Sequence, residues 1–174
     1  LAIYQFISSF QIAYSPYLMK TYAEGDILKV NKLILVFTKV SFLLYFLVTI
    51  PLFLFCGEIL RFWLGEVPDY SIYFTKLALF LVFFEILSLP LVSVVQASGK
   101  IKKYQLYLSL IIIINIPLAY GFFIISDKPE LFFYSKIFIS FLVFLYRVFL
   151  VSKLLYFNIL DYFRDIFLDL TIFI

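Results

Sequence analysis

The sequence predicts an all-α membrane protein, built as a polytopic bundle of transmembrane helices. Hydrophobic residues make up 65% of the chain and aromatic residues 22%, which is more than a soluble domain of 174 residues can bury. Four long apolar stretches are separated by short polar segments, and each exceeds the roughly 20 residues that cross a bilayer core as a helix. These stretches lack the alternation over about 10 residues that is typical of a transmembrane β-barrel.

The predicted elements follow one another along the chain. The four complete spans are expected over residues 33–55, 72–97, 105–126 and 131–152. Residues 1–14 predict a partial transmembrane helix, residues 15–32 a cytoplasmic loop, and residues 58–64 a short interfacial helix. Residues 153–165 predict a cytoplasmic interfacial helix, because their apolar residues recur at roughly helical spacing, and residues 166–174 the start of a further span. Since both ends of the chain lie in apolar runs, we expect a single lobe, as a fragment of a larger protein.

Basic residues outside the spans predict how the chain is oriented. They concentrate in alternate connections, which hold Lys20, Lys29, Lys32, Lys100, Lys102, Lys103, Lys153 and Arg164, whereas the opposite connections hold Arg61 and Lys128. The positive-inside rule predicts that the first group faces the cytoplasm. Lys102 and Lys128 are therefore expected on opposite sides of the membrane.

The composition argues against several classes of function. The chain has no histidine and a single cysteine, Cys56, so it offers no histidine base, no histidine metal ligand and no internal disulfide. The five glycines form no phosphate-binding loop, and a net charge of +3 does not indicate a nucleic-acid partner. We expect no catalytic residues, no metal site and no cofactor, and the protein is not expected to be an enzyme.

Glu85 is the most informative single residue, because it lies near the middle of the span predicted over residues 72–97. A carboxylate at that depth costs roughly 3 kcal/mol or more unless it is protonated, paired or facing water. In one interpretation Glu85 couples transport to protons or cations, or contacts a substrate in a transport cavity. In the other it is a neutral group that hydrogen-bonds to a neighbouring helix. Either interpretation predicts that Glu85 faces the protein interior.

Other polar residues within the spans extend the candidate transport cavity. Arg147 either reaches the headgroups or meets an anionic substrate in a cavity, and Asn115 either links helices or belongs to the site. Gln5 and Gln11 make the first helix polar, as expected of a helix that lines a watery interior. Long side chains allow three lysines to extend toward the headgroups: Lys39, Lys76 and Lys136.

Prolines and one glycine predict where the helices bend or end. Pro51, Pro90 and Pro117 each remove a backbone hydrogen bond and are candidate helix hinges, although kinks also serve irregular packing. Gly99 lies in the short connection SGKIKK, where we expect a positive φ or the end of the preceding helix.

Four local motifs together resemble a known family. They are SPYLMKTYAEGD (residues 15–26), ILRFWLGEVPDY (59–70), ASGKIKKYQ (97–105) and NIPLAYGF (115–122). In this order and spacing they resemble the C-terminal half of bacterial Wzx-type polysaccharide flippases, the O-antigen repeat-unit transporters of the multidrug/oligosaccharidyl-lipid/polysaccharide exporter superfamily. The resemblance covers nearly the whole chain and implies the C-terminal lobe of a two-lobe transporter fold.

The resemblance also implies a function and its partners. An undecaprenyl-diphosphate-linked oligosaccharide would cross the bacterial inner membrane in polysaccharide or O-antigen biosynthesis, with its head in a central cavity and its tail in the bilayer. The implied partners are membrane lipids, this lipid-linked substrate and the missing N-terminal lobe. Arg147, with Lys39 or Lys76, would supply positive charge for the diphosphate.

Two other functions remain open from the sequence. A cation-coupled multidrug or metabolite antiporter of the same superfamily would share the fold, and Glu85 suits its cationic substrates better than a basic cavity does. A membrane enzyme of polysaccharide assembly is the second alternative, although the absence of histidine and of a large loop outside the membrane argues against it.

Overall fold

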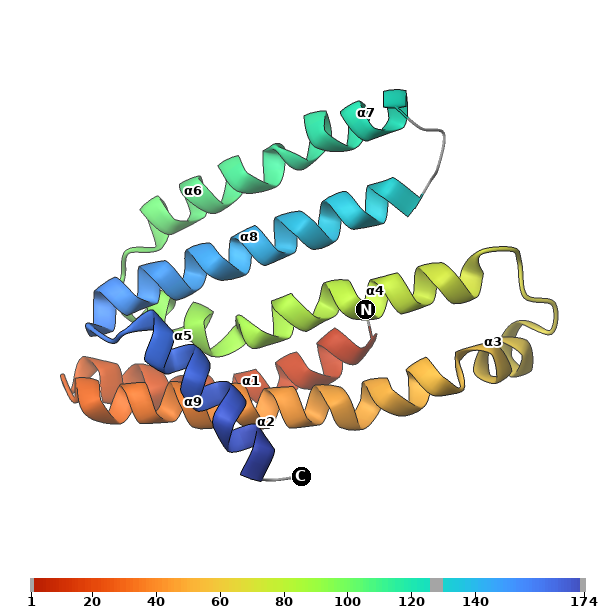
Figure 1. The fold of residues 1–174 in the computed structure, drawn as a ribbon. Coiled ribbons are helices and arrows are strands. Elements are labelled where there is room, and N and C mark those ends of the chain that lie inside the picture. Colours follow the sequence, from red (N-terminus) through yellow and green to blue (C-terminus); the bar gives the residue numbers. More distant parts are fainter. Residues whose placement is uncertain (1, 126–129, 173–174) are drawn as a thin grey trace.

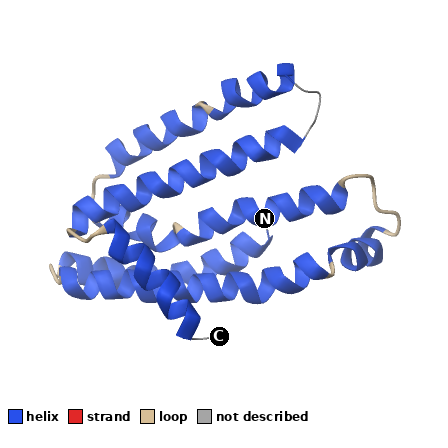
Figure 2. Cartoon of the chain, viewed as in Figure 1, coloured by secondary structure: helices blue, strands red, loops and turns tan. Residues whose placement is uncertain are grey.

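The computed structural model describes residues 2–125 and 130–172, and within these ranges the protein is an all-α bundle without strands (Figures 1 and 2). Four helical stretches are long and apolar enough to cross a membrane: Ile27–Leu54, Ser71–Ala97, Ile101–Phe122 and Glu130–Leu155. The fold class predicted from the sequence is therefore confirmed, and each of these stretches contains most of one predicted span.

The long helical stretches run back and forth along one common direction, whereas α9 crosses the bundle obliquely (Figure 1). Their bounds are α1 Ala2–Ala23, α2 Ile27–Leu54, α3 Cys56–Leu64, α4 Ser71–Leu87, α5 Leu89–Ala97, α6 Ile101–Ile113, α7 Asn115–Ile125, α8 Glu130–Leu155 and α9 Ile159–Ile172. The short helix α3 confirms the helix expected over residues 58–64.

The long loop predicted over residues 15–32 is wrong, because helices occupy most of it. α1 continues through Pro16 to Ala23, and α2 begins at Ile27. The connection is short because Gly25 takes a φ of 78° and the Asp26 carboxylate accepts a hydrogen bond from the Lys29 backbone N–H at 3.0 Å. Asp26 thereby caps the first turn of α2. The residues at these helix ends are polar, as in a loop, but their backbone is helical.

The division predicted between residues 165 and 166 is also wrong. α8 continues to Leu155, and α9 runs without interruption from Ile159 across the expected boundary. The turn between them contains Tyr156 at a φ of 56°, and the Asn158 side chain accepts a hydrogen bond from the Leu160 backbone N–H at 3.0 Å. α9 packs against α2 and α8.

Two of the four long stretches are interrupted within their length, each just before a proline. The break between α4 and α5 falls at Ser88, two residues before Pro90, and the break between α6 and α7 falls at Ile114, three residues before Pro117. A proline has no N–H to donate to the carbonyl four residues earlier, which weakens the helix at that turn. Pro51 differs, because it lies inside the last turn of α2, where its carbonyl accepts from the Phe55 N–H at 2.9 Å.

The connections alternate between the two ends of the bundle, as the charge distribution predicts. The turns around residues 24–26, 98–100 and 156–158 gather at one end in Figure 1, and the α3–α4 loop lies at the other. Gly99 ends the turn after α5 with a φ of 70°, which confirms the expectation for this residue. The comparison of Lys102 with Lys128 stays a prediction, since Lys128 lies outside the described residues.

The core of the bundle lies where α1, α2, α5 and α8 meet. Leu18, Leu91, Val94, Val95 and Val151 are fully buried there. α1 packs against both α2 and α5, and close packing of this kind drives helix association in a membrane, where lipid chains are as apolar as the core. The α6–α7 stretch contrasts with this core, since only 6% of its most apolar 18-residue segment is buried inside the protein.

Candidate functional site

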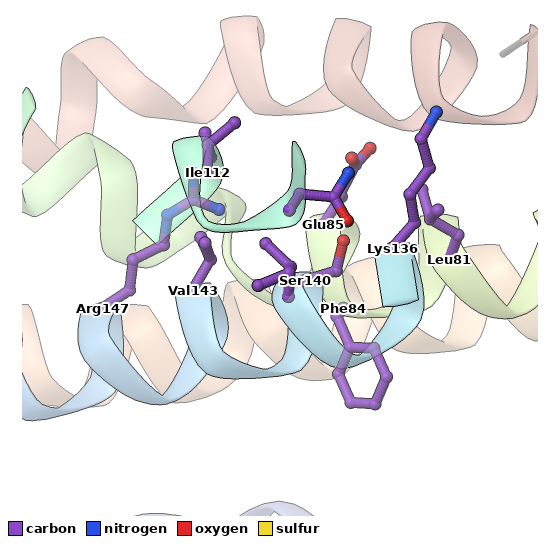
Figure 3. Close-up of a pocket in the computed structure, with 10 residues that line it drawn as sticks. Leu81, Phe84, Glu85, Ile112, Lys136, Ser140, Val143 and Arg147 are labelled. Atoms are coloured by element: carbon purple, nitrogen blue, oxygen red, sulfur yellow. The ribbon is translucent and has the colours of Figure 1, made fainter. Parts of the chain in front are cut away.

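A cavity of about 290 Å³ lies between α4, α8 and the junction of α6 and α7 (Figure 3). Polar and charged side chains line this cavity, although the three helical stretches around it are otherwise apolar. Its lining consists of Leu81, Phe84, Glu85, Ile112, Asn115, Lys136, Ile139, Ser140, Val143 and Arg147. The cavity lies beside both helix breaks, because Glu85 comes three residues before Ser88 and Asn115 is the first residue of α7.

α8 supplies one wall of the cavity from a single face. Lys136, Ser140, Val143 and Arg147 follow one another at intervals of four, three and four residues, which is the spacing of one face of an α-helix. Figure 3 shows their side chains along successive turns of α8, with Glu85 of α4 facing them. The opposite face of α8 is apolar and exposed at Phe138.

A hydrogen bond to a neighbouring helix positions the Arg147 side chain. Its Nε–H donates to the Tyr104 hydroxyl of α6 at 2.9 Å. Tyr104 is buried, and its ring stacks on that of Tyr146 at a centroid distance of 6.3 Å. Because this bond uses Nε, the NH₂ groups at the end of the guanidinium are the donors that a ligand in the cavity would meet.

Glu85 is half-buried and lies within electrostatic range of Arg147. The expectation that this carboxylate faces the protein interior agrees with its place in the cavity wall. Two cationic side chains, Lys136 and Arg147, share the cavity with it, so positive charge is in excess. A partly desolvated site of this kind strengthens electrostatic attraction to an anion.

Asn115 contributes an unused acceptor. Its Oδ1 atom is buried and has no hydrogen-bond partner among the described residues. A buried polar atom without a partner costs about 1–3 kcal/mol, so this carbonyl is suited to accept a hydrogen bond from a hydroxyl or amine donor. Lys136, which also lines the cavity, has its ammonium 4.5 Å from the centroid of the Phe132 ring.

The structure thus brings together three of the candidate cavity residues, Glu85, Asn115 and Arg147, and places the other two elsewhere. Gln11 joins α1 to α5, since its Nε2 donates to the Leu89 carbonyl at 3.0 Å and to the Ser93 hydroxyl at 3.1 Å. Gln5 is exposed. Lys39 and Lys76, which the family resemblance implied for a diphosphate, are not part of the cavity lining.

Sequence reasoning missed three residues of the site. The sequence predicts for Lys136 only a side chain that extends toward the headgroups, and it gives no prediction for Ser140 or Tyr104. The spacing of Lys136, Ser140 and Arg147 on one helical face was visible in the sequence and would have joined them. The Tyr104–Arg147 bond joins residues 43 positions apart and had no sequence signal.

The part of the chain that the structure describes contains no group of three or more Cys, Asp or Glu side chains that could hold a metal ion. Comparison with known proteins adds no assignment. No protein-family model matches the chain, and neither does any curated protein or solved structure.

Proposed function

We propose that the protein is a membrane transporter that flips a lipid-linked oligosaccharide from the cytoplasmic to the outer leaflet of the bacterial inner membrane. The observation that carries this proposal is the cavity that Lys136 and Arg147 line, between helical stretches long enough to cross a bilayer. Charged side chains within a membrane are costly and mark substrate or ion pathways.

The charges of the cavity favour a phosphate-bearing substrate. Arg147 offers a planar guanidinium that forms paired hydrogen bonds with phosphate oxygens, and Lys136 adds a second positive charge. Glu85 offsets only part of this charge. An undecaprenyl diphosphate, as the family resemblance implies, would place its anionic group against these two residues.

The uncharged groups of the cavity favour a sugar beside the phosphate. The unpaired Asn115 carbonyl accepts hydrogen bonds, and the Ser140 hydroxyl both donates and accepts them. At about 290 Å³ the cavity is small for a complete oligosaccharide, so it would hold only the part of the headgroup next to the lipid. The breaks at Ser88 and Ile114 flank it and are suited to let its walls move.

A cation-coupled antiporter is the second candidate, and the observation that favours it is the position of Glu85 in the cavity wall. A carboxylate in a transport cavity can bind a proton or a cationic substrate in exchange. The excess of positive charge from Lys136 and Arg147 makes this candidate the weaker one.

Transport by the purified protein in lipid vesicles tests the proposal. A fluorescent oligosaccharide linked to undecaprenyl diphosphate serves as the substrate, and its access to an external quencher reports flipping. We expect Arg147→Gln to lower the flipping rate at least tenfold, because a charge-assisted hydrogen bond contributes roughly 1.5–3 kcal/mol.

Lys153→Gln is the matched control, since Lys153 lies on the same helix near the end of the bundle, with its ammonium 4.2 Å from the Phe149 ring centroid. It should flip at the wild-type rate. Unchanged flipping by Arg147→Gln and Lys136→Gln would contradict the flippase. If the wild-type protein instead exchanges a fluorescent cation for protons, and Glu85→Gln abolishes this exchange, the result would favour the antiporter.

A further inference from the structure

A second cavity, of about 370 Å³, lies between α2 and α4 in the half of the bundle nearest α3. Aromatic rings from both helices line it: Tyr45, Phe46, Phe53, Phe80 and Phe83. The Tyr45 hydroxyl already donates to the Leu79 carbonyl at 2.8 Å. The surface that remains available to a ligand is therefore almost entirely hydrocarbon, in contrast to the charged cavity on the other side of α4.

This aromatic groove is open toward the surroundings of the bundle. Phe80 is 56% exposed and Phe53 is 36% exposed, although both belong to stretches long and apolar enough to span the membrane. Rings so exposed in a transmembrane stretch contact lipid chains. The groove therefore offers a flexible hydrocarbon chain a concave site rather than a flat helix surface.

A positive charge lies at the mouth of the groove. Lys76 is one helical turn before Phe80 on α4, and its ammonium lies 4.6 Å from the centroid of the Phe53 ring, which itself lines the groove. No carboxylate in the described part of the chain forms an ion pair with Lys76. A lysine held over an aromatic ring in this way is partly desolvated, which strengthens its attraction to an anion.

We propose that this groove binds a phospholipid with an anionic headgroup, whose acyl chain lies along the aromatic rings and whose phosphate meets Lys76. The two parts of the site match the two parts of such a lipid. A zwitterionic lipid would fill the groove equally well, but its own cation would offset the attraction to Lys76. Basic groups between transmembrane helices recognise anionic headgroups in this way. The proposal does not depend on the function of the charged cavity.

Quenching of a single tryptophan by brominated lipids tests the proposal in vesicles. Trp63 is the chain's single tryptophan, so Trp63→Phe combined with Phe80→Trp moves the reporter into the groove. We expect brominated phosphatidylglycerol to reach half-maximal quenching of this tryptophan at about one fifth of the concentration that brominated phosphatidylcholine needs. One lysine near a lipid phosphate contributes a preference of that size.

Three variants in the same background distinguish a lipid site at Lys76 from nonspecific attraction of anionic lipids to the protein's lysines. Lys76→Gln should bring the preference to about one, and Lys76→Arg should keep it. Lys153→Gln should leave it unchanged, because Lys153 has a similar ring contact away from the groove, with its ammonium 4.2 Å from the Phe149 centroid. A Lys153→Gln effect as large as that of Lys76→Gln would overturn the proposal. Equal quenching by both lipids, or quenching by neither, would overturn it as well, since the groove would then accept any lipid or be covered by protein.

Discussion

Single residues in this protein are informative when their polarity conflicts with the apolar helix that carries them. Glu85, Asn115 and Arg147 each lie in such a conflict, and all three line one cavity. Gln11 is also a polar residue in an apolar helix, but its side chain donates hydrogen bonds to the Leu89 carbonyl and the Ser93 hydroxyl of α5. The difference is whether the neighbouring helix offers a partner, and that depends on packing between helices distant in sequence.

Tyr104→Phe tests whether a neighbour positions Arg147. The variant removes only the hydroxyl that accepts from Arg147 Nε at 2.9 Å and leaves the ring packing in place. We expect flipping to slow roughly threefold to tenfold with little change in protein abundance, since one hydrogen bond contributes about 1 kcal/mol. Tyr107→Phe is the control, because Tyr107 is an exposed tyrosine on the same helix and lies outside the cavity lining. Equal rates for both variants would show that Arg147 does not need this bond.

Glu85→Gln tests whether the cavity carboxylate takes part in coupling. Glutamine keeps the size and hydrogen-bonding reach of the side chain but cannot gain or lose a proton near neutral pH. If Glu85 couples transport to protons, the variant should remain folded and transport at a rate that no longer changes between pH 6 and pH 8. Transport measured across this range with an unchanged pH profile would leave Glu85 a structural role only.

At the scale of helices, apolar length predicted each crossing but not where each helix ends. The helices continue past the apolar stretches, as α1 does through Lys20, whose ammonium lies 3.9 Å from the Glu24 carboxylate one turn later. Hydropathy detects residues that contact lipid chains, whereas a helix continues into water wherever capping and local pairs support it. The predicted loop over residues 15–32 failed for this reason.

The prolines also show that the sequence does not predict where a helix breaks. Pro90 and Pro117 follow breaks in the helix, whereas Pro51 lies within the last turn of α2. A proline removes one hydrogen bond in every case, but a break also requires that neighbouring helices accommodate the displaced turn. The positions of the prolines were visible in the sequence, and their different consequences were not.

Paired glycine substitutions test the turn that ends α5. Gly99 has a φ of 70°, where an added Cβ has open space but strains the backbone, so Gly99→Ala should lower the free energy of unfolding by about 1 kcal/mol. Gly121 lies inside α7 with equally open space, so Gly121→Ala should raise that free energy by about 0.5 kcal/mol. Unfolding in mixed detergent micelles measures both. A shift of the same sign for both variants would contradict the assigned conformations.

For the whole molecule, the sequence was sufficient for the fold class and insufficient for the arrangement of the helices. The 65% hydrophobic composition required burial in lipid, and the spacing of the apolar stretches gave the order of the crossings. The contacts of α1 with α2 and α5, and of α4 with α8, determine which faces meet. They also decide that Lys136 and Ser140 join Glu85, while Gln5 remains exposed. Such long-range packing leaves no periodic signal in a single sequence.

The orientation of the whole bundle is tested by cysteine labelling in intact cells. In a Cys56→Ser background, Lys102→Cys should be protected from a membrane-impermeant reagent, whereas Asp69→Cys in the α3–α4 loop should react, because the positive-inside rule places residue 102 in the cytoplasm. Lys128→Cys should react as well. Labelling of residue 102 with protection of residue 69 would reverse the orientation.

The proposed function requires a polar cavity that water reaches inside a membrane-embedded bundle, and labelling of two positions on α8 tests for it. Ser140 lines the cavity, whereas Phe138 lies two residues away at nearly the same depth and is 52% exposed on the opposite, lipid-facing side. In vesicles of the Cys56→Ser protein, a small hydrophilic thiol reagent should modify Ser140→Cys and leave Phe138→Cys unmodified, since thiolates do not form in lipid. After the vesicles are dissolved and the protein is unfolded in dodecyl sulfate, both should react. Modification of Phe138→Cys in vesicles as fast as Ser140→Cys would contradict the membrane embedding, and protection of both would contradict the cavity.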